Sequence, residues 1–409
     1  MAVEEEWVIN VIEQIAHFGE GTRGISRLAF SDADDKARKY VMDLMCKIGL
    51  AVRVDEIGNI IGRLEGDSDL PAVLTGSHLD TVPESGKYDG VVGVAGGLAA
   101  IKCLKERGIL LHHPIELVVF VAEESSRFRF ATMGSKAMIG AANIPAWTKI
   151  KDQDGVSLPQ ALAAQGLDIQ TVRQAFRDKS SIKAFVELHI EQGRILEKEG
   201  NTIGVVDLIS APTRFKITVE GIAAHSGATP MEDRQDALVS AAMIILAIQE
   251  IALEQSDRGT VGTVGALTVH PGAMNVIPGL VEMWVDLRGT DHNSIIECLQ
   301  DIKDAVSTIA DAQETPVAIE MLSSEKPVAM HADIVQVIED VCRQSSVSYQ
   351  RMHSGAGHDA MNMARIAPTG MIFVPSRGGI SHHPDEYTAP QDILTGINVL
   401  TEVLYQLAK

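Results

Sequence analysis

Apolar and polar residues follow two rhythms along the first 210 residues, one with the spacing of helices and one with that of strands. Helical spacing occurs over residues 8–18, 32–48 and 90–106. Strand-like runs occur over residues 52–55, 59–64, 72–76 and 116–121. The last two runs are mostly apolar without alternation, as in parallel strands buried on both faces. This succession of helices and strands predicts an α/β domain with a mixed sheet.

The pattern changes between residues 212 and 327. Alternating strands and long helices are predicted there over residues 214–220, 236–254, 263–269, 280–287, 293–309 and 316–322. Their order, β-α-β-β-α-β, is that of a ferredoxin-like unit. The α/β pattern then resumes. We therefore predict a discontinuous α/β domain, residues 1–211 and 328–409, interrupted by an inserted α+β domain, residues 212–327.

Composition narrows the classes of function. With 409 residues the chain can form two domains, and its mean hydropathy near zero is that of a globular protein. A net charge of −20 argues against partners such as nucleic acid or membranes, because binding to them depends on clustered lysine and arginine. No apolar run approaches the roughly 20 residues of a membrane helix, and residues 91–101 come closest. Four widely spaced cysteines and an acidic start favour a cytoplasmic protein.

Potential metal ligands follow several of the predicted strands. They are His78, Asp80, Asp89, Glu123, Glu124, His189 and His382. A lone histidine after a strand is usually structural, and two adjacent glutamates usually form a solvated turn. In open α/β sheets, however, ligands gather beyond the carboxyl ends of the strands, where His78 and Glu123-Glu124 are expected. Imidazoles with carboxylates are a ligand set for Zn²⁺ or Mn²⁺, so the sequence predicts a metal-dependent hydrolase.

Longer motifs occupy residues 24–28, 76–82, 183–193, 225–231, 275–278, 286–288 and 354–360. Through them the chain resembles the hydantoinase/carbamoylase amidohydrolases, a branch of the clan of di-metal aminoacylases and zinc carboxypeptidases. The similarity covers nearly the whole chain. Ser125, where the family usually has glycine, and residues 211–213 depart from the pattern. The resemblance implies a di-zinc peptidase-like catalytic domain with an inserted lid or dimerisation domain.

The resemblance also implies the roles of the metal ligands. Asp89 would bridge two divalent ions, which could be Zn²⁺, Mn²⁺ or Co²⁺. His78 and His189 would complete one site, and Glu124 and His382 the other. From the residues alone, His383 could serve in place of His382. Asp80 would orient the His78 ring, and Glu123 would be the general base.

A second group of residues is implied to bind a small anionic ureido substrate. These residues are Gln192, Arg214, His225, Asn275, Arg288, Gly355 and Ala356. His225 would stabilise the oxyanion in the site of a partner subunit, because the inserted domain is expected to form a homodimer. An arginine on a strand is otherwise usually an exposed salt-bridge partner.

The expected activity is hydrolysis of a ureido C–N bond, first of all that of allantoate. The alternatives are an N-carbamoyl-L-amino-acid hydrolase or a ureidopropionase, and more remotely an aminoacylase or a dipeptidase. A metal-binding protein without activity, serving as an interaction partner, is the alternative from another class. The presence of Glu123 argues against this alternative, because a protein without activity would not need a general base.

Overall fold

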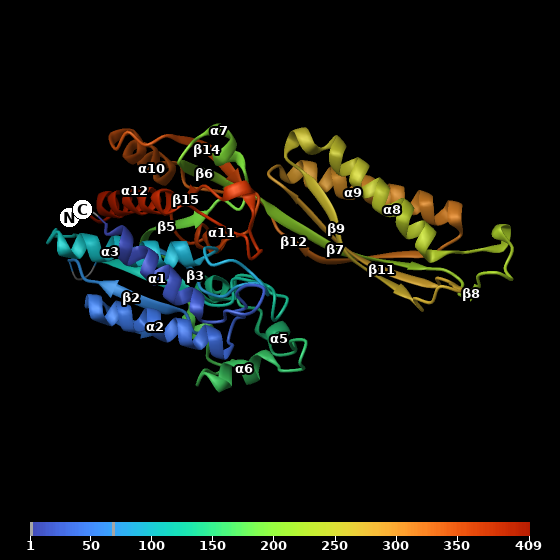
Figure 1. The fold of residues 1–409 in the computed structure, drawn as a ribbon, viewed down its shortest axis with the longest axis horizontal. Helices are drawn as coiled ribbons and strands as arrows, with labels where there is room; N and C mark the ends of the chain where they lie inside the picture. The colour runs from blue at the N-terminus through green and yellow to red at the C-terminus, as the bar shows by residue number, and fades with distance from the viewer. Residues whose placement is uncertain (1–2, 68–69) are drawn as a thin grey trace. The chain divides into compact units, whose positions relative to one another are not determined.

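The computed structural model describes residues 3–67 and 70–409, and the chain divides into two compact units. Unit 1 comprises Met1–Asp207, Ala329–Ser354 and His358–Lys409, and unit 2 comprises Leu208–Val328 and Gly355–Gly357. The inserted segment therefore begins at Leu208, whereas the sequence analysis placed its start at residue 212. Unit 2 also includes a short turn from the C-terminal part of the chain. Figure 1 shows both units with their elements labelled.

Unit 1 is built on a nine-stranded mixed sheet. Its strands are β1 (Ala51–Val54), β2 (Ile60–Leu64), β3 (Ala72–His78), β4 (Ile115–Phe120), β5 (Ile182–Ile190), β6 (Ile203–Ile209), β13 (Val328–Ala329), β14 (Tyr349–Ser354) and β15 (Thr369–Val374). The order is β1-β2-β4-β3-β5-β15-β6-β13, and β14 pairs with β6. The four central strands, β4, β3, β5 and β15, are parallel, while β2 and β6 pair with them in the antiparallel direction. The prediction of a mixed sheet is confirmed.

Unit 1 also contains helices, some of which pack on this sheet. They are α1 (Glu5–His17), α2 (Asp32–Ile48), α3 (Val91–Glu106), α4 (Met133–Met138), α5 (Ile144–Trp147), α6 (Leu158–Ala164), α7 (Ile195–Glu199), α10 (Ala332–Gln344), α11 (Asp359–Met363) and α12 (Pro390–Ala408). Helix α3 packs on β3, β4 and β5, and α12 lies beside it on β5 and β15. Thirteen residues of α3 are buried, which explains why its sequence is glycine- and alanine-rich: small side chains allow close packing on the sheet.

Unit 2 contains one four-stranded antiparallel sheet with two long helices. The elements are β7 (Ala211–Glu220), β8 (Ala224–His225), α8 (Ala237–Glu254), β9 (Val261–His270), β10 (Val276–Ile277), β11 (Leu280–Gly289), α9 (His292–Gln313) and β12 (Val317–Ser324). The sheet order is β12-β7-β11-β9, and β8 pairs separately with β10. In strands β7 and β11 every second residue is buried, and the residues between are half-buried or, at Glu220, exposed. Their buried side chains form one core with α8 and α9, which lie side by side (Figure 1).

Helix α8 is long and apolar enough to cross a membrane by length and composition, with a mean hydropathy of 1.8 over its 18 residues. Residues 91–101 were expected to be the most membrane-like run, but the predicted helix over 236–254 is the longer and more continuously apolar one. Six α8 residues are buried, and four of them, including Ile244 and Ile248, belong to the unit 2 core. Other apolar side chains remain exposed, notably Leu246 and Leu253 at 67% and 70%. Within this unit, α8 is therefore a core helix with an additional apolar face.

Candidate metal centre

The carboxyl ends of the central parallel strands bring the predicted ligands to one edge of the sheet. His78 is the last residue of β3 and lies opposite Phe120, the last residue of β4. Glu123 and Glu124 follow β4 by three and four positions, and His189 is the penultimate residue of β5. Because these strands run parallel, their ends meet, as the sequence analysis expected.

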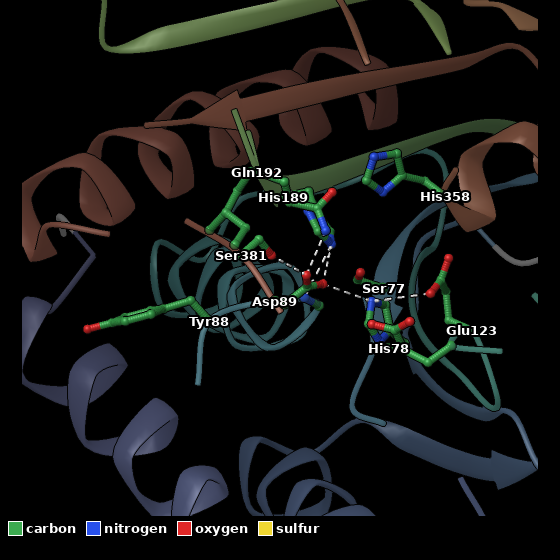
Figure 2. A network of polar contacts seen from close by, with 12 residues as sticks. Ser77, His78, Tyr88, Asp89, Glu123, His189, Gln192, His358 and Ser381 are labelled. Atoms are coloured by element: carbon green, nitrogen blue, oxygen red, sulfur yellow. Dashed lines mark hydrogen bonds and ion pairs between the residues drawn. The ribbon is translucent and has the colours of Figure 1, made fainter. Parts of the chain in front are cut away.

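Asp89 lies at the centre of this group (Figure 2). Its Oδ1 is 3.4 Å from His78 Nε2 and 3.2 Å from His189 Nε2. Its Oδ2 is 3.3 Å from His382 Nε2, which in turn is 3.1 Å from Glu124 Oε1. Asp89 therefore faces two histidines with one carboxylate oxygen and a third histidine with the other.

Two groups of donor atoms share this carboxylate. One consists of His78, Asp89 and His189, and the other of Asp89, Glu124 and His382; within each group the donor atoms lie within 4.8 Å of one another. Nitrogen and oxygen donors of this kind suit Zn²⁺, Mn²⁺ or Co²⁺, and a bridging carboxylate is the usual link between paired ions. The residues therefore fit a pair of divalent ions. His383 lies outside both groups and is exposed.

Main-chain carbonyl groups orient two of the rings. His78 Nδ1 is 2.9 Å from the carbonyl oxygen of Asp80, and His189 Nδ1 is 2.9 Å from that of Ile190, so both Nε2 atoms face Asp89. Asp80 was expected to orient the His78 ring; its carbonyl oxygen makes that contact, while its carboxylate lies 3.9 Å from Nδ1. It accepts hydrogen bonds from the backbone N–H groups of Glu123 and Glu124 instead. Asp80 thus contacts His78 through its main chain and the glutamate pair through its side chain.

Gly90 allows Asp89 and His78 to approach each other. Its φ is +67°, a left-handed conformation that favours glycine. A Cβ atom at this position would lie 2.6 Å from His78 Nε2. Any larger residue would therefore displace the ring or the loop.

The electrostatics of the group favour charged histidines when no ion is bound. Burial disfavours the imidazolium of His78 and of His189, but their contacts with Asp89 outweigh it and raise both pKa values. Hydrogen bonds with Asp89 and Glu124 raise the pKa of His382 to about 11. Burial opposes ionisation of Asp89, yet the charge of His189 and the contacts with His382 and His78 hold its pKa well below the usual range. A divalent ion would take the place of these protons.

Glu123 lies beside the donor groups without belonging to either of them. It is 8% exposed, and its Oε2 is 3.8 Å from His78 Nε2. Burial raises its pKa well above the usual value; the positive charge of His78 opposes this shift, and the charges of Glu124 and Asp359 reinforce it. A carboxylate with a raised pKa at the edge of a metal centre can accept and return a proton near neutral pH.

Gln192 also reaches the centre. Its Nε2 donates a hydrogen bond of 2.6 Å to Asp89 Oδ2, and its φ is +60°. Its Oε1 is buried and has no hydrogen-bond partner among the described residues. The amide predicted to bind substrate is thus anchored at one end and has a free acceptor at the other.

Arg214 and Arg288 share one carboxylate in unit 2. The Nε and Nη2 atoms of Arg288 are 2.9 and 3.0 Å from the two oxygens of Asp286, and Arg214 Nε is 3.1 Å from Asp286 Oδ2. Arg288 Nη1 donates to the carbonyl oxygen of Gly355, 3.3 Å away, in the turn that also contains Ala356. Asp286 therefore occupies the fork that was expected to be available for a substrate carboxylate. Two cations facing one anion leave this cluster with a net positive charge.

His225 and Asn275 lie at the other end of unit 2. His225 is in β8 and pairs with Val276, the residue after Asn275, and the carbonyl oxygen of Asn275 accepts a hydrogen bond from Ser226 N. Strand β8 follows the last residue of β7, Glu220, whereas Arg214 is near the start of β7. Six residues of extended strand separate Arg214 from Glu220, roughly 20 Å. The predicted substrate residues of unit 2 thus form two separate clusters.

Comparison with known proteins identifies the class. Residues 74–406 match the model of peptidase family M20/M25/M40, so the chain belongs to this family. Enzymes of this family depend on metal ions, and the donor groups around Asp89 could hold such ions. The chain is a hydrolase that acts on carbon–nitrogen bonds other than peptide bonds.

Relatives with known activities cover almost the whole chain. It is 41% identical to an N-carbamoyl-L-amino acid amidohydrolase of Geobacillus stearothermophilus, with 94% of each chain aligned. It is 38% identical to a ureidoglycolate hydrolase of Arabidopsis thaliana (100% of this chain and 87% of the relative). It is 37% identical to the allantoate amidohydrolase of Escherichia coli (94% and 93%).

Solved structures agree with these relatives. A hydantoinase/carbamoylase family amidase from Burkholderia multivorans superposes with a TM-score of 0.88 at 36% identity, over 100% of this chain and 98% of that one. The resemblance drawn from the sequence motifs is confirmed.

Proposed function

We propose that the chain hydrolyses the ureido C–N bond of a small carboxylate, with allantoate as the first candidate substrate. N-carbamoyl-L-amino acids are the second candidate, and ureidoglycolate is a third, suggested by the relatives. The observation that carries the proposal is the sharing of Asp89 between two donor groups, with the buried Glu123 next to His78. The relatives that the chain resembles act on ureido compounds according to their names.

The protein's own residues would carry the proton. When bound, the ions supply Lewis acidity to the substrate carbonyl and to the attacking water. Glu123 accepts a proton from the water and returns it to the leaving nitrogen, so the bond between the carbonyl carbon and nitrogen breaks. This step releases ammonia and leaves a carbamate on the other nitrogen. The carbamate then loses carbon dioxide by cleavage of its own C–N bond, so one water and one ureido group yield ammonia, carbon dioxide and the amine. Gln192 Oε1, the buried acceptor, is suited to bind an N–H group of the ureido moiety.

The arginine pair would recognise the substrate carboxylate. Asp286 binds one edge of the Arg288 guanidinium and fixes its orientation. A further hydrogen bond from Arg288 to the substrate carboxylate therefore costs less side-chain entropy. The remaining positive charge of the cluster favours an anion. We further infer that the enzyme works in the cytoplasm, consistent with four free cysteines.

We also propose a homodimer formed through unit 2. Strand β9 is an edge strand, and α8, which packs on it, exposes Val239, Met243, Leu246 and Leu253. A strand with one unpaired edge beside an apolar helix face is suited to association of two copies. His225 and Asn275 are too far from Arg214 within one unit to contact the same small substrate. The two clusters would serve one site only if they came from different subunits.

Ammonia release tests the reaction. Protein reconstituted with Mn²⁺, Co²⁺ or Zn²⁺ is assayed with allantoate, N-carbamoyl-L-methionine and ureidoglycolate, and Glu123→Gln protein serves as the control. We expect the highest kcat/KM for allantoate. Ammonia release from none of the three would overturn the proposal, while a higher kcat/KM for N-carbamoyl-L-methionine or ureidoglycolate would reassign the substrate.

A further inference from the structure

Glu386 is a buried carboxylate that none of the predicted roles uses. It is 4% exposed, and no lysine or arginine among the described residues forms an ion pair with it. Its Oε1 accepts hydrogen bonds from Tyr88 N and Asp89 N, at 2.8 and 3.1 Å. A buried carboxylate without a cationic partner is costly, which raises the question of what retains it.

The other oxygen of Glu386 points to a second part of the metal centre. Ser381 Oγ lies 3.0 Å from Glu386 Oε2 and 2.9 Å from Asp89 Oδ2. Ser381 immediately precedes His382, whose φ of +56° is uncommon for a residue with a side chain. The backbone N–H of Glu386 also donates to the carbonyl oxygen of His383. Glu386 therefore contacts both the loop that carries Asp89 and the turn that carries His382.

Packing around Glu386 preserves these contacts. The rings of Tyr88 and Tyr387 meet edge to face at 5.9 Å, and the Arg377 guanidinium covers the Tyr387 ring at 4.1 Å. Gly86 faces Glu386 so closely that a Cβ atom there would overlap the Glu386 Cβ. The backbone around Asp89 is thus fitted to a carboxylate at position 386.

We propose that Glu386 is a positioning residue for the metal pair. It holds the bridging ligand Asp89 by two main-chain hydrogen bonds, and through Ser381 and the 383–386 turn it holds His382 at the distance the second site requires. The negative charge of Glu386 is also compensated once ions bind. Two divalent ions bring four positive charges, Asp89 and Glu124 neutralise two of them, and Glu386 interacts with the remaining positive charge. Outer-sphere partners of this kind typically change metal affinity about 10–100-fold.

Metal titration of the full-length apo protein tests this role. Zn²⁺ or Mn²⁺ is titrated in competition with a chromophoric chelator, and the thermal unfolding of each apo protein is recorded in parallel. Glu386→Ala should weaken metal binding about 10–100-fold. Glu386→Gln should recover part of this loss, since its Oε1 can still accept from Tyr88 N and Asp89 N. Asp385→Asn is the matched control: it removes one charge at the adjacent, exposed position and should leave the affinity unchanged.

Other outcomes would overturn the proposal. If Glu386→Ala lowers apo stability but binds both ions with the wild-type constants, Glu386 only supports the loops. If Glu386→Ala does not fold, Glu386→Gln and Ser381→Ala decide, because each keeps the main-chain turn; unchanged affinity in both would overturn the role. The inference rests on the metal centre of the proposed function, but the titration uses no substrate. Failure of the ureido assignment would leave its result intact.

Discussion

At the scale of single residues, substitutions of the adjacent Glu123 and Glu124 should affect different quantities, the first the rate and the second the number of bound ions. Glu124 contacts His382 within a donor group, whereas Glu123 lies outside both groups. Glu123→Gln should therefore retain two ions and lose about 10²–10⁴-fold in kcat, the usual contribution of a general base. Glu124→Gln should lose one ion. Metal analysis together with kcat measures both effects, and the reverse pattern would exchange the two assignments.

Metal binding should depend on pH through the histidines. The pKa of His382 is raised to about 11, so this ring holds a proton at neutral pH in the absence of ions, and contacts with Asp89 raise the pKa values of His78 and His189 as well. An ion needs the neutral ring, so binding must release protons and become tighter as pH rises toward 11. Calorimetry in buffers of different ionisation enthalpy measures the release, and His382→Ala should release fewer protons. Heats that do not vary with the buffer would contradict this expectation.

Arg288 should discriminate between charged and neutral substrates. Its loss removes a charge-assisted hydrogen bond of about 1.5–3 kcal/mol. Arg288→Ala should thus raise KM for a carboxylate substrate about 10–100-fold, with a much smaller change for a neutral ureido analogue. Steady-state kinetics with both compounds measure the difference. An equal increase in both KM values would mean that Arg288 only supports Asp286 and the Gly355 turn.

Sequence reasoning found residues whose local signal is strong and missed those defined by distant contacts. His78 and Glu123-Glu124 follow apolar strands, so their common edge could be predicted. The bond between His78 and the Asp80 carbonyl could not, because main-chain geometry leaves no residue signature. Glu386 contacts residues almost 300 positions earlier in the chain, and nothing near it marks that contact. The pairing of Asp286 with Arg288 could have been predicted, because residues two positions apart in a strand lie on the same face.

At the scale of elements, long periodic segments were predicted well and short ones were missed. The helices observed at Asp32–Ile48 and Ala237–Glu254 agree with the predictions at 32–48 and 236–254. Helices α4, α5 and α6 have four to seven residues, too few for a periodic pattern to emerge. Strand β14, Tyr349–Ser354, is mostly polar, and it pairs only with β6. Tertiary pairing rather than its own sequence makes it a strand.

Gly76 should be essential to the pairing of β3 with β4. A Cβ atom at this position would overlap the carbonyl oxygen of Val118 on β4. Gly76→Ala should therefore lower the free energy of unfolding by about 1–3 kcal/mol or more, and it should weaken metal binding because His78 follows on the same strand. Gly265→Ala on β9 is the control, since a Cβ atom there meets no atom within 4 Å. Thermal unfolding of both variants measures the difference, and equal stability would show that the strands can separate without cost.

At the scale of the whole molecule, the proposed dimer would account for two features of unit 2. Its core is complete without the outer face of α8, so the exposed leucines of that face have no role within the unit. The same unit carries two clusters of predicted substrate residues, one around Arg214 and Arg288 in the four-stranded sheet and one around His225 in the separate pair of β8 and β10. A monomer would leave one of them unused, whereas a twofold dimer could bring the His225 cluster of each subunit to the metal centre of the other.

Mixing two inactive variants tests this arrangement. In a heterodimer of His225→Ala and Glu123→Gln subunits, one composite site contains wild-type Glu123 and wild-type His225, and the other contains neither. Random exchange makes half of the dimers heterodimers, and each has one intact site, so about a quarter of the wild-type activity should return. Ammonia release is measured after subunit exchange has been verified with differently tagged subunits. If exchange is complete and no activity returns, His225 acts within its own subunit or outside any site.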